Sequence, residues 1–389
     1  MEVVYLSNAQ IPSRSTNALQ VMRMCEGFRQ AGVNVTLVHP FRIGNRPEGL
    51  SGEAWEFYGI ANRFRIVTLP TPLTRGLAGA RWFARPVEAV PLALYLTWRS
   101  HLGRTGFVCY GRSMLGAWSA LRMRRLSGSR GACEGVFLEL HDEPSTESEW
   151  RVISEVDGVV VISESLRRRL VRRSERLSHR VWVEPDAVRL PIDRPTRARQ
   201  DALRSDLDPR GNRPLVVYAG RVNAEKGAGI VLEAASLYPD AQFVLVGRVY
   251  EQMFYERARR SGNVRLLGFV PPSQVSQYLA IADVLVLPST PSLSYATYTS
   301  PLKLFEYMSS EKPIVASDLP VLQEILCHER NALIYPAHDP KALAETLARV
   351  TRDRSLAQRI ASQALHDVEE HSWGRRAHRI ISHMRSVLP

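Results

Sequence analysis

The sequence alternates short apolar, β-branched runs with longer helical patterns, and it does so in two successive series. The runs of the first series are 3–6, 33–38, 65–69, 107–110, 136–140, 158–162 and 181–183. Those of the second series lie in PLVVYAG, AQFVLVG, NVRLLGF, DVLVLPS, PIVAS and NALIYP, within 214–336. Nearly continuous apolar runs are typical of parallel strands that helices cover on both faces. The pattern therefore predicts an α/β protein with two doubly wound domains in tandem.

The expected domain boundaries follow from a break between the two series. Segment 191–213 has no apolar stripe and is rich in proline and charge, so we interpret it as a linker. The first domain then covers 1–190 and the second 214–371, and we expect the last helical pattern, 372–389, to pack back on the first domain. In such a pair the domains face each other across a cleft, and ligands bind at the carboxyl ends of the strands.

The charge balance favours an anionic partner. The chain of 389 residues carries a net charge of +12, which suits nucleic acid, anionic lipid or a phosphorylated substrate. The arginine bias of a GC-rich genome explains the same number equally well. We find no zinc spacing and no aromatic sheet signature, and we interpret the basic run 165–180 as the solvated face of a helix, so we do not expect nucleic acid as the partner.

Neither a membrane span nor a metal site is expected. No run approaches the ~20 apolar residues of a transmembrane helix, and the start lacks a signal-peptide pattern, so we expect a cytoplasmic protein. The cysteines and histidines show no metal-binding spacing. Asp206 and Asp208 form an Asp-x-Asp pair, but they lie in the polar segment before Pro209, and we interpret them as a turn or helix end.

The stretch VVYAGRVNAEKG, 216–227, predicts a phosphate site. A strand ends at Gly220, and a short loop then leads to a helix that begins near Gly227. Arg221 and Lys226 place one cation on each side of this strand-to-helix turn, which suits a diphosphate. The alternative is a surface turn with solvated charges.

The stretch SPLKLFEYM, 300–308, predicts the start of a helix, with Ser300 as N-cap and Pro301 at the first helical position. The amides of Leu302 and Lys303 are then free to bind an anion, which would also offset the unfavourable dipole at Lys303. Glu306 follows one turn later. The alternative is an exposed Lys303–Glu306 pair worth only ~0.2–0.5 kcal/mol.

The stretch ELHDEP, 139–144, closes a strand of the first series. His141 at its carboxyl end, facing the cleft, could bond a hydroxyl or carbonyl of a substrate, although a structural role is equally compatible. A metal site from His141, Asp142 and Glu143 is disfavoured, because adjacent residues on an extended chain point apart.

Segment 75–104 mixes arginine with aromatic residues, as interfacial membrane helices do. The residues concerned are Arg75, Arg81, Arg85 and Arg99 together with Trp82, Phe83 and Trp98. A core helix with snorkelling arginines is the alternative.

Taken together, these motifs resemble the retaining glycosyltransferases of family four, which have the GT-B architecture of two Rossmann-like domains. The matching stretches of the second half are YAGRVNAEKG, VLVG, VRLLGFVPPSQVSQYLAIADVLVLPS and SPLKLFEYMSSEKPIVASDLP. The first half matches more loosely, through ALQVMRMCEGFRQAGVNVTLV, ELHDEP and VVVISESL.

This resemblance implies a nucleotide-diphosphate sugar as donor, with UDP favoured and GDP as the alternative, and no metal. Arg221 and Lys226 would hold the diphosphate, Glu306 the ribose hydroxyls, and His141 the donor sugar. The other donor-binding residues that the resemblance assigns are Thr16, Gly247, Phe269, Val270, Ser300, Pro301, Leu302 and Lys303, with Phe269 and Val270 near the base. The implied catalytic residues are His141, Arg221 and Lys226.

The sequence departs from the family pattern in three places, one of them a pair of residues. Tyr298 stands where the family often has the first of two glutamates, and Ser15 and Thr16 align with a glycine pair after the first strand. Glu311 replaces a glycine at the end of the motif helix, a position that often adopts positive φ.

The implied function is transfer of a sugar, with retention, to a glycan, lipid-linked or small-molecule acceptor in surface polysaccharide or glycoconjugate synthesis. A peripheral location on the inner face of the cell membrane would suit segment 75–104. The alternatives are a GT-B epimerase or phosphorylase, and a non-enzymatic nucleic-acid-binding protein.

Overall fold

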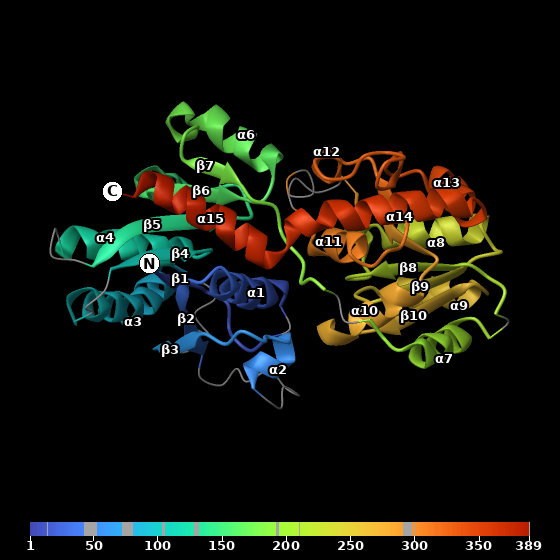
Figure 1. The fold of residues 1–389 in the computed structure, drawn as a ribbon, viewed down its shortest axis with the longest axis horizontal. Helices are drawn as coiled ribbons and strands as arrows, with labels where there is room; N and C mark the ends of the chain where they lie inside the picture. Colours follow the sequence, from blue (N-terminus) through green and yellow to red (C-terminus); the bar gives the residue numbers. More distant parts are fainter. Residues whose placement is uncertain are drawn as a thin grey trace. The chain divides into compact units, whose positions relative to one another are not determined.

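The computed structural model describes residues 1–389 except 14, 43–52, 72–80, 103–105, 128–131, 192–193, 210, 291–297, 299 and 389. The chain divides into two compact units, each a parallel sheet with helices packed on it (Figure 1). The first unit comprises Met1–Ile162, Leu166–Pro185 and Trp373–Pro389, and the second comprises Ser163–Ser165 and Asp186–Ser372.

Within the described residues, the first unit has a seven-stranded parallel sheet in the order β3-β2-β1-β4-β5-β6-β7. Its strands are β1 Glu2–Leu6, β2 Asn34–Arg42, β3 Arg65–Thr71, β4 Phe107–Gly111, β5 Cys133–Leu140, β6 Gly158–Val161 and β7 Val181–Val183. Its helices are α1 Thr16–Gln30, α2 Ala54–Tyr58, α3 Arg81–Leu102, α4 Met114–Ser127, α5 Glu147–Glu155, α6 Glu164–Arg173 and α15 Trp373–Val387.

The described part of the second unit has a six-stranded parallel sheet in the order β10-β9-β8-β11-β12-β13. Its strands are β8 Leu215–Ala219, β9 Gln242–Val246, β10 Val264–Gly268, β11 Val284–Leu287, β12 Ile314–Ser317 and β13 Leu333–Tyr335. Its helices are α7 Arg197–Leu207, α8 Ala228–Leu237, α9 Gln252–Arg260, α10 Pro272–Ile281, α11 Leu302–Met308, α12 Pro320–Gln323, α13 Pro340–Arg352 and α14 Arg354–Val368. Every strand expected from the apolar runs is present, so the predicted fold of two doubly wound sheets is confirmed.

The central strand β8 shows how the second sheet is covered. Alternate residues of a strand point to opposite faces. Leu215 and Val217 face a core shared with α7, α10 and α11, whereas Val216 and Tyr218 face a core shared with α8, α9 and α13. All four are essentially inaccessible to water. Burial on both faces is the physical reason why these strands are continuous apolar runs in the sequence.

The interpretation of 191–213 as a linker is wrong for 197–207, which form the helix α7. Leu203 and Leu207 on its buried face belong to one core of the second unit, and Thr196 caps its first turn by accepting from the amide of Arg199. Only two large apolar residues anchor the helix, which is too few to show as a stripe in the sequence. Asp208 ends the helix and pairs with Arg213 at 3.0 Å, so the Asp-x-Asp pair is the helix-end feature that we expected.

The C-terminal helix α15 belongs to the first unit and packs on α1. A Cβ at Gly27 of α1 would lie 2.5 Å from the carbonyl oxygen of Trp373, so the two backbones touch where only glycine fits. The same helix buries Arg376 completely, and this guanidinium pairs with Glu139.

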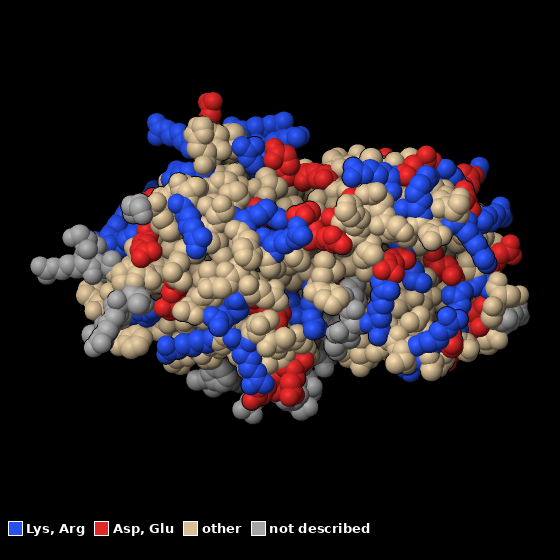
Figure 2. Space-filling view, in the orientation of Figure 1, with Lys and Arg blue, Asp and Glu red and all other residues tan. Residues whose placement is uncertain are grey.

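The basic run 165–180 forms α6 and the turn that follows it. Leu166 and Leu170 are buried, while basic side chains cover the outer surface of this region (Figure 2). Two of its arginines pair with exposed acids, Arg169 with Glu143 and Arg173 with Glu147. This is the solvated helix face expected from the sequence. Among the described residues, no helix has the length and apolarity needed to cross a bilayer.

The position of Leu203 gives a direct test of the helix that sequence reasoning missed. Leu203→Ala removes a core side chain and should lower the free energy of unfolding by about 2–5 kcal/mol. The exposed Asp201 on the same helix is the matched control, and Asp201→Ala should change it by less than about 0.5 kcal/mol. Urea unfolding of both variants measures the difference. An equal, small effect of both would contradict the packing of α7.

Candidate functional site

Three glycines bring the carboxyl ends of β8, β9 and β10 into contact. The amide of Gly220 donates to the carbonyl of Val246 at 2.8 Å, and the amide of Gly247 donates to that of Gly268 at 2.8 Å. A Cβ on Gly247 would lie 1.8 Å from the carbonyl oxygen of Gly220, and φ at Gly247 is 144°. Any larger residue would force the strand ends apart. Gly247, assigned to the donor by resemblance, therefore also has a structural reason to be glycine.

The loop between β8 and α8 is held rigidly at both ends. The side chain of Asn223 accepts from the amide of Lys226 at 3.1 Å, and the hydroxyl of Tyr218 donates to the carbonyl of Arg221 at 2.7 Å. At Gly227, φ is 78°, and a Cβ would lie 1.6 Å from the carbonyl oxygen of Pro288. The backbone that carries Arg221 and Lys226 is therefore fixed before any ligand binds.

Lys303 reaches the same place from α11. Its Nζ donates to the hydroxyl of Tyr218 at 3.3 Å and lies 4.3 Å from the centre of that ring, a cation–π distance. It also lies 3.4 Å from where a Cβ of Gly220 would be. The lysine of the SPLKLFEYM stretch thus meets the Gly220 end of β8, as the proposed phosphate chemistry requires.

The cluster formed by Arg221, Lys226 and Lys303 is short of negative charge. Burial lowers the pKa of Lys303 from 10.5 to about 7, and repulsion from Lys226 and Arg221 adds to this while Glu306 opposes it. Burial also lowers the pKa of Lys226, with a further contribution from Arg221. Like charges held together disfavour their own ionisation. An anion placed among them would relieve the repulsion, so the charge and burial of the cluster suit an anionic ligand.

The helix α11 begins later than the sequence indicated. The predicted N-cap, Ser300, is wrong: Pro301 is the N-cap, with no side-chain bond, and Leu302 is the first helical residue. The hydroxyl of Ser300 accepts instead from the amide of Asp186 at 3.4 Å. The hydroxyl that local capping rules assigned to the helix start is therefore used in a contact with a residue distant in the sequence. The amides of Leu302 and Lys303 still lie in the first turn, which has no intrahelical acceptors for them.

Other predicted donor residues of the second unit lie on α11 and after β10. Glu306 lies one turn beyond Lys303 on α11 and is close enough to raise its pKa. Phe269, directly after β10, is 46% exposed, and Val270 packs against the core below it. Tyr298, at the family's glutamate position, is buried at 7% exposure.

Thr16 and His141 lie in the first unit. Thr16 is the first residue of α1, and Ser15 caps that helix by accepting from the amide of Ala18 at 3.2 Å. His141 directly follows β5, and its Nε2 lies 2.5 Å from the Oε1 of Glu139. The two residues that align with the family's glycine pair are therefore the N-cap and the first residue of α1.

Glu139 connects His141 to the C-terminal helix. Its other oxygen, Oε2, accepts from Tyr110 and from Nη1 of Arg376, the latter at 3.2 Å. Burial alone would raise the pKa of Glu139, but Arg376 and then His141 hold it well below its usual range. Glu139 is therefore a buried carboxylate whose charge is matched by a buried guanidinium.

Sequence reasoning missed this network, although signals for it exist. Glu139 lies two residues before His141, so both side chains lie on the same face of the chain. Arg376 lies within the apolar stripe of α15, whose other buried members are Trp373, Ala377, Ile380, Ile381 and Met384. A cation on such a stripe indicates a buried acidic partner. Tyr218, which holds Lys303, has no comparable signal in the sequence.

No group of three or more acidic, histidine or cysteine side chains among the described residues could hold a metal ion. The cation cluster itself has the wrong charge for a metal.

Two tandem parallel-sheet Rossmann-like units define a GT-B protein, the architecture of many glycosyltransferases. The solved structures similar to this chain are of that class. HepE of Anabaena, in complex with UDP, superposes with a TM-score of 0.74 and 15% identity, covering 99% of this chain and 100% of that one. A sucrose-phosphate synthase of Thermosynechococcus elongatus gives 0.72 and 19%, with 99% and 98% covered. At these identities the likeness establishes the fold.

A family model matches a segment of the second unit. Residues 199–367 match the model described as Glycosyl transferases group 1. The resemblance stated from the sequence is thereby confirmed at the level of the group.

Among curated relatives, an alpha-D-kanosaminyltransferase of Streptomyces kanamyceticus is 25% identical over 244 residues, 59% of this chain and 60% of that protein. A phosphatidyl-myo-inositol mannosyltransferase of Mycobacterium leprae is 28% identical over 166 residues, 41% of this chain and 42% of that protein. The chain thus matches these relatives over 42–60% of their length.

The lowered pKa of Lys303 predicts that anion binding takes up a proton. At pH 8 a side chain with a pKa of about 7 is mostly neutral, and a bound diphosphate favours its charged form. Affinity for pyrophosphate should therefore rise as the pH falls from 9 to 7. Calorimetry at pH 8 in two buffers of different ionisation enthalpy measures the uptake. Lys303→Arg, which is always charged, should take up about one proton fewer; equal uptake would contradict the assignment.

Proposed function

We propose that this chain is a retaining glycosyltransferase of family four that transfers a sugar from a nucleoside-diphosphate sugar, UDP-sugar first. The observation that carries the proposal is the cluster of Arg221, Lys226 and Lys303 at the carboxyl end of β8, inside a group 1 domain. A diphosphate supplies the negative charge that this cluster lacks. The complexes of HepE with UDP and with UDP-glucose support UDP as the nucleotide.

In this proposal the leaving diphosphate is stabilised by side chains of the protein. Arg221 and Lys226 contact its oxygens, and Lys303 becomes charged as the donor binds. Cations fixed before reaction stabilise charge that develops on the leaving group without reorganisation. A divalent metal is then not needed, and we expect transfer in excess chelator.

Glu306 and Phe269 complete the nucleotide site. A carboxylate accepts from two ribose hydroxyls, each bond worth about 1.5–3 kcal/mol. The exposed ring of Phe269 and the backbone at Val270 are placed at the end of β10, where the base is expected. The amides of Leu302 and Lys303 add donors, but α11 has only seven residues, so most of the attraction comes from the cations.

His141 contacts the donor sugar from the first unit, as the resemblance implies. Glu139 orients its ring by holding Nε2, which leaves Nδ1 for the substrate. Arg376 keeps Glu139 charged, so the histidine always meets a carboxylate. Glu139 and Arg376 are positioning residues in this scheme, and His141 is the residue that touches the substrate.

The function is tested with a panel of nucleotide sugars. Binding of a UDP-sugar should raise the melting temperature of the full chain, and transfer or slow hydrolysis of the same sugar in chelator should follow. Recovery of an isomerised nucleotide sugar would instead show an epimerase, and phosphate-dependent release a phosphorylase. A shift with oligonucleotides and none with nucleotide sugars would contradict the proposal.

Glu306→Gln separates a ligand role from a structural one. The change keeps the shape but removes the charge, and affinity for UDP should fall at least tenfold, about 1.4 kcal/mol. The melting temperature of the free protein should stay the same. Glu345→Gln, on the exposed face of α13, is the control and should leave affinity unchanged. Unchanged UDP affinity with a lower melting temperature for Glu306→Gln would mean that Glu306 is structural.

The acceptor side of the proposal rests on α3. Val90, Leu94 and Trp98 recur at helical spacing and are 56%, 66% and 51% exposed, which is an apolar stripe in contact with water. Arg99, in contrast, pairs with Glu2 and lies over the ring of Phe107, so it is a packing residue. Arg75 and Arg104 lie outside the described residues, and nothing is described of the side chains of Arg81, Trp82, Phe83 and Arg85.

We infer a lipid-linked or surface-glycan acceptor and a peripheral position on the anionic inner face of the cell membrane. An interfacial helix buries such a stripe at the headgroup boundary, and the net charge of +12 adds attraction.

The stripe predicts membrane binding that one charge can abolish. The full chain should float with anionic liposomes at low salt, and Leu94→Glu should lose at least most of that flotation. Leu237→Glu, at a 54% exposed leucine of the second unit, is the control and should float like the wild type. Equal recovery of all three proteins, or equal flotation with neutral lipid, would contradict the inference.

A further inference from the structure

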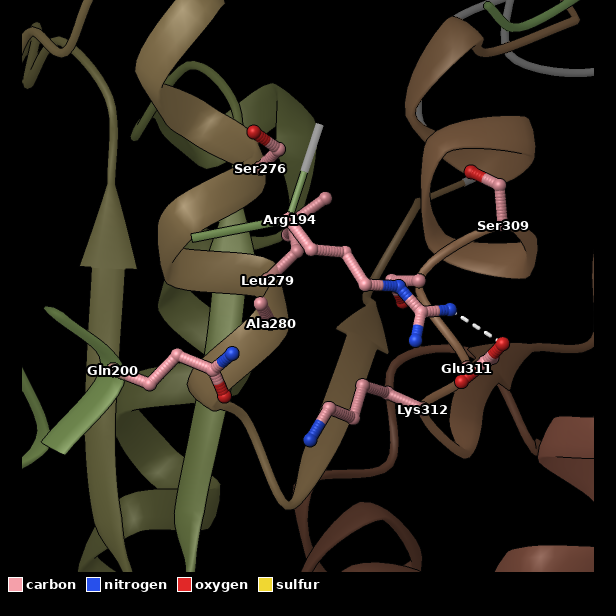
Figure 3. Close-up of a pocket in the computed structure, with 9 residues that line it drawn as sticks. Arg194, Gln200, Ser276, Leu279, Ala280, Ser309, Glu311 and Lys312 are labelled. Atoms are coloured by element: carbon pink, nitrogen blue, oxygen red, sulfur yellow. Dashed lines mark ion pairs between the residues drawn. The ribbon is translucent and has the colours of Figure 1, made fainter. Parts of the chain in front are cut away.

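A polar cavity lies near the amino end of β12, so it is at the opposite end of the strands from the cation cluster. It has a volume of about 160 Å³ and is formed by α7, α10 and the turn that joins α11 to β12 (Figure 3). Its lining residues are Arg194, Gln200, Ser276, Leu279, Ala280, Ser309, Ser310, Glu311 and Lys312. Lys312 precedes β12, whereas the cation cluster follows β8. Because the strands are parallel, the cavity lies at the amino ends of the strands and the cation cluster at their carboxyl ends.

The charges at this cavity leave one cation uncompensated. Arg194 pairs with Glu311, and nearby Arg204 pairs with Asp283 at 2.6 Å. Lys312 has no hydrogen bond or ion pair with any residue that the structure describes. In Figure 3 its ammonium group points toward the side of Gln200, away from the Glu311 carboxylate. The described groups around the cavity therefore carry one net positive charge.

The environment of Lys312 is unfavourable for that charge. Burial lowers its pKa, Asp283 opposes this, and Arg204 and Arg194 add to the lowering while Glu311 opposes it. A partly buried ammonium without a partner is costly, and an anion in the cavity would remove the cost.

The backbone of Glu311 is strained at the same place. Its φ is 57°, a left-handed conformation that is unfavourable for a non-glycine residue. This confirms the positive φ expected where the family has glycine. The glutamate side chain holds Arg194 at the cavity wall. Strain of this kind persists where the residue has a task, and glycine could not perform this one.

The cavity offers cationic hydrogen-bond donors from two segments of the chain. Lys312 comes from the turn before β12 and Arg194 from the segment before α7, whereas the hydroxyl of Ser276 points away from both in Figure 3. The hydroxyls of Ser309 and Ser310 already donate to the carbonyls of Glu306 and Tyr307, at 2.8 and 2.6 Å.

We propose that this cavity is a binding site for a small oxyanion, a phosphate group in preference to a carboxylate. A tetrahedral group offers acceptors in several directions at once, which matches cationic donors that approach from two different segments. A cavity of about 150 Å³ can hold a benzene-sized ligand, so the phosphate can carry a small organic part. The inference uses none of the residues of the proposed donor site.

Inorganic phosphate is the probe, and the background must silence the cation cluster. Lys226→Met with Lys303→Met removes two of its three cations. In that full-length background, phosphate should still bind with one site per chain by calorimetry. Adding Lys312→Met should weaken this binding at least tenfold, while adding Lys341→Met, at an exposed lysine of α13, should not change it.

The melting temperature distinguishes lost binding from lost folding. Lys312→Met removes an uncompensated buried charge, so the free protein should melt at the same or a higher temperature. Sulfate should compete with phosphate and acetate should not. Equal phosphate affinity with and without Lys312→Met would overturn the site, and equal competition by acetate would overturn the phosphate preference. UDP affinity of the wild type, which tests the proposed function, is independent of either result.

Discussion

The close approach of three basic residues at the carboxyl end of β8 is the constraint on which the candidate site depends. The glycines at 220, 227 and 247 let the strand ends and the loop approach closely, so the backbone places Arg221 and Lys226 near each other. Tyr218 contacts the ammonium group of Lys303 through its ring, as a cation–π pair, and accepts a hydrogen bond from it at the hydroxyl. The protein therefore stores an unfavourable charge arrangement in a rigid frame. A ligand gains affinity by relieving it, because the frame has already been paid for by the fold.

The first unit treats a buried charge in the opposite way. Glu139 and Arg376 neutralise each other inside the unit, and Arg376 also donates to the carbonyls of Glu184 and Pro185 and to the sulfur of Met24. A fully bonded pair specifies one arrangement of β5 and α15. His141 then inherits a fixed orientation from that pair. The second unit holds several cations close together, whereas the first unit pairs its buried carboxylate with a guanidinium, and that pair positions His141.

The sequence predicted what depends on long apolar runs and failed where tertiary contacts decide. Strands such as β8 and β9 were predicted correctly because burial on both faces requires a continuous apolar run in the sequence. The helix α7 was not, since only Leu203 and Leu207 anchor it. Ser300 fits every local rule for an N-cap, yet a distant amide takes its hydroxyl. The cations of the candidate site were predicted because loop and helix-start motifs are local. The contacts of Tyr218 with Lys303, and of Arg376 with Glu139, arise only through the fold.

The way the chain enters and leaves the second unit has a consequence for its evolution. Val188 and Ser372 pair across a parallel bridge, and the amide of Val188 donates to the carbonyl of His371. Apart from Ser163–Ser165, the second unit is thus one continuous insertion whose two ends are neighbours. Such a segment can be exchanged between related genes as a cassette, with only two junctions to preserve. The sheet that receives the graft then does not have to be redesigned.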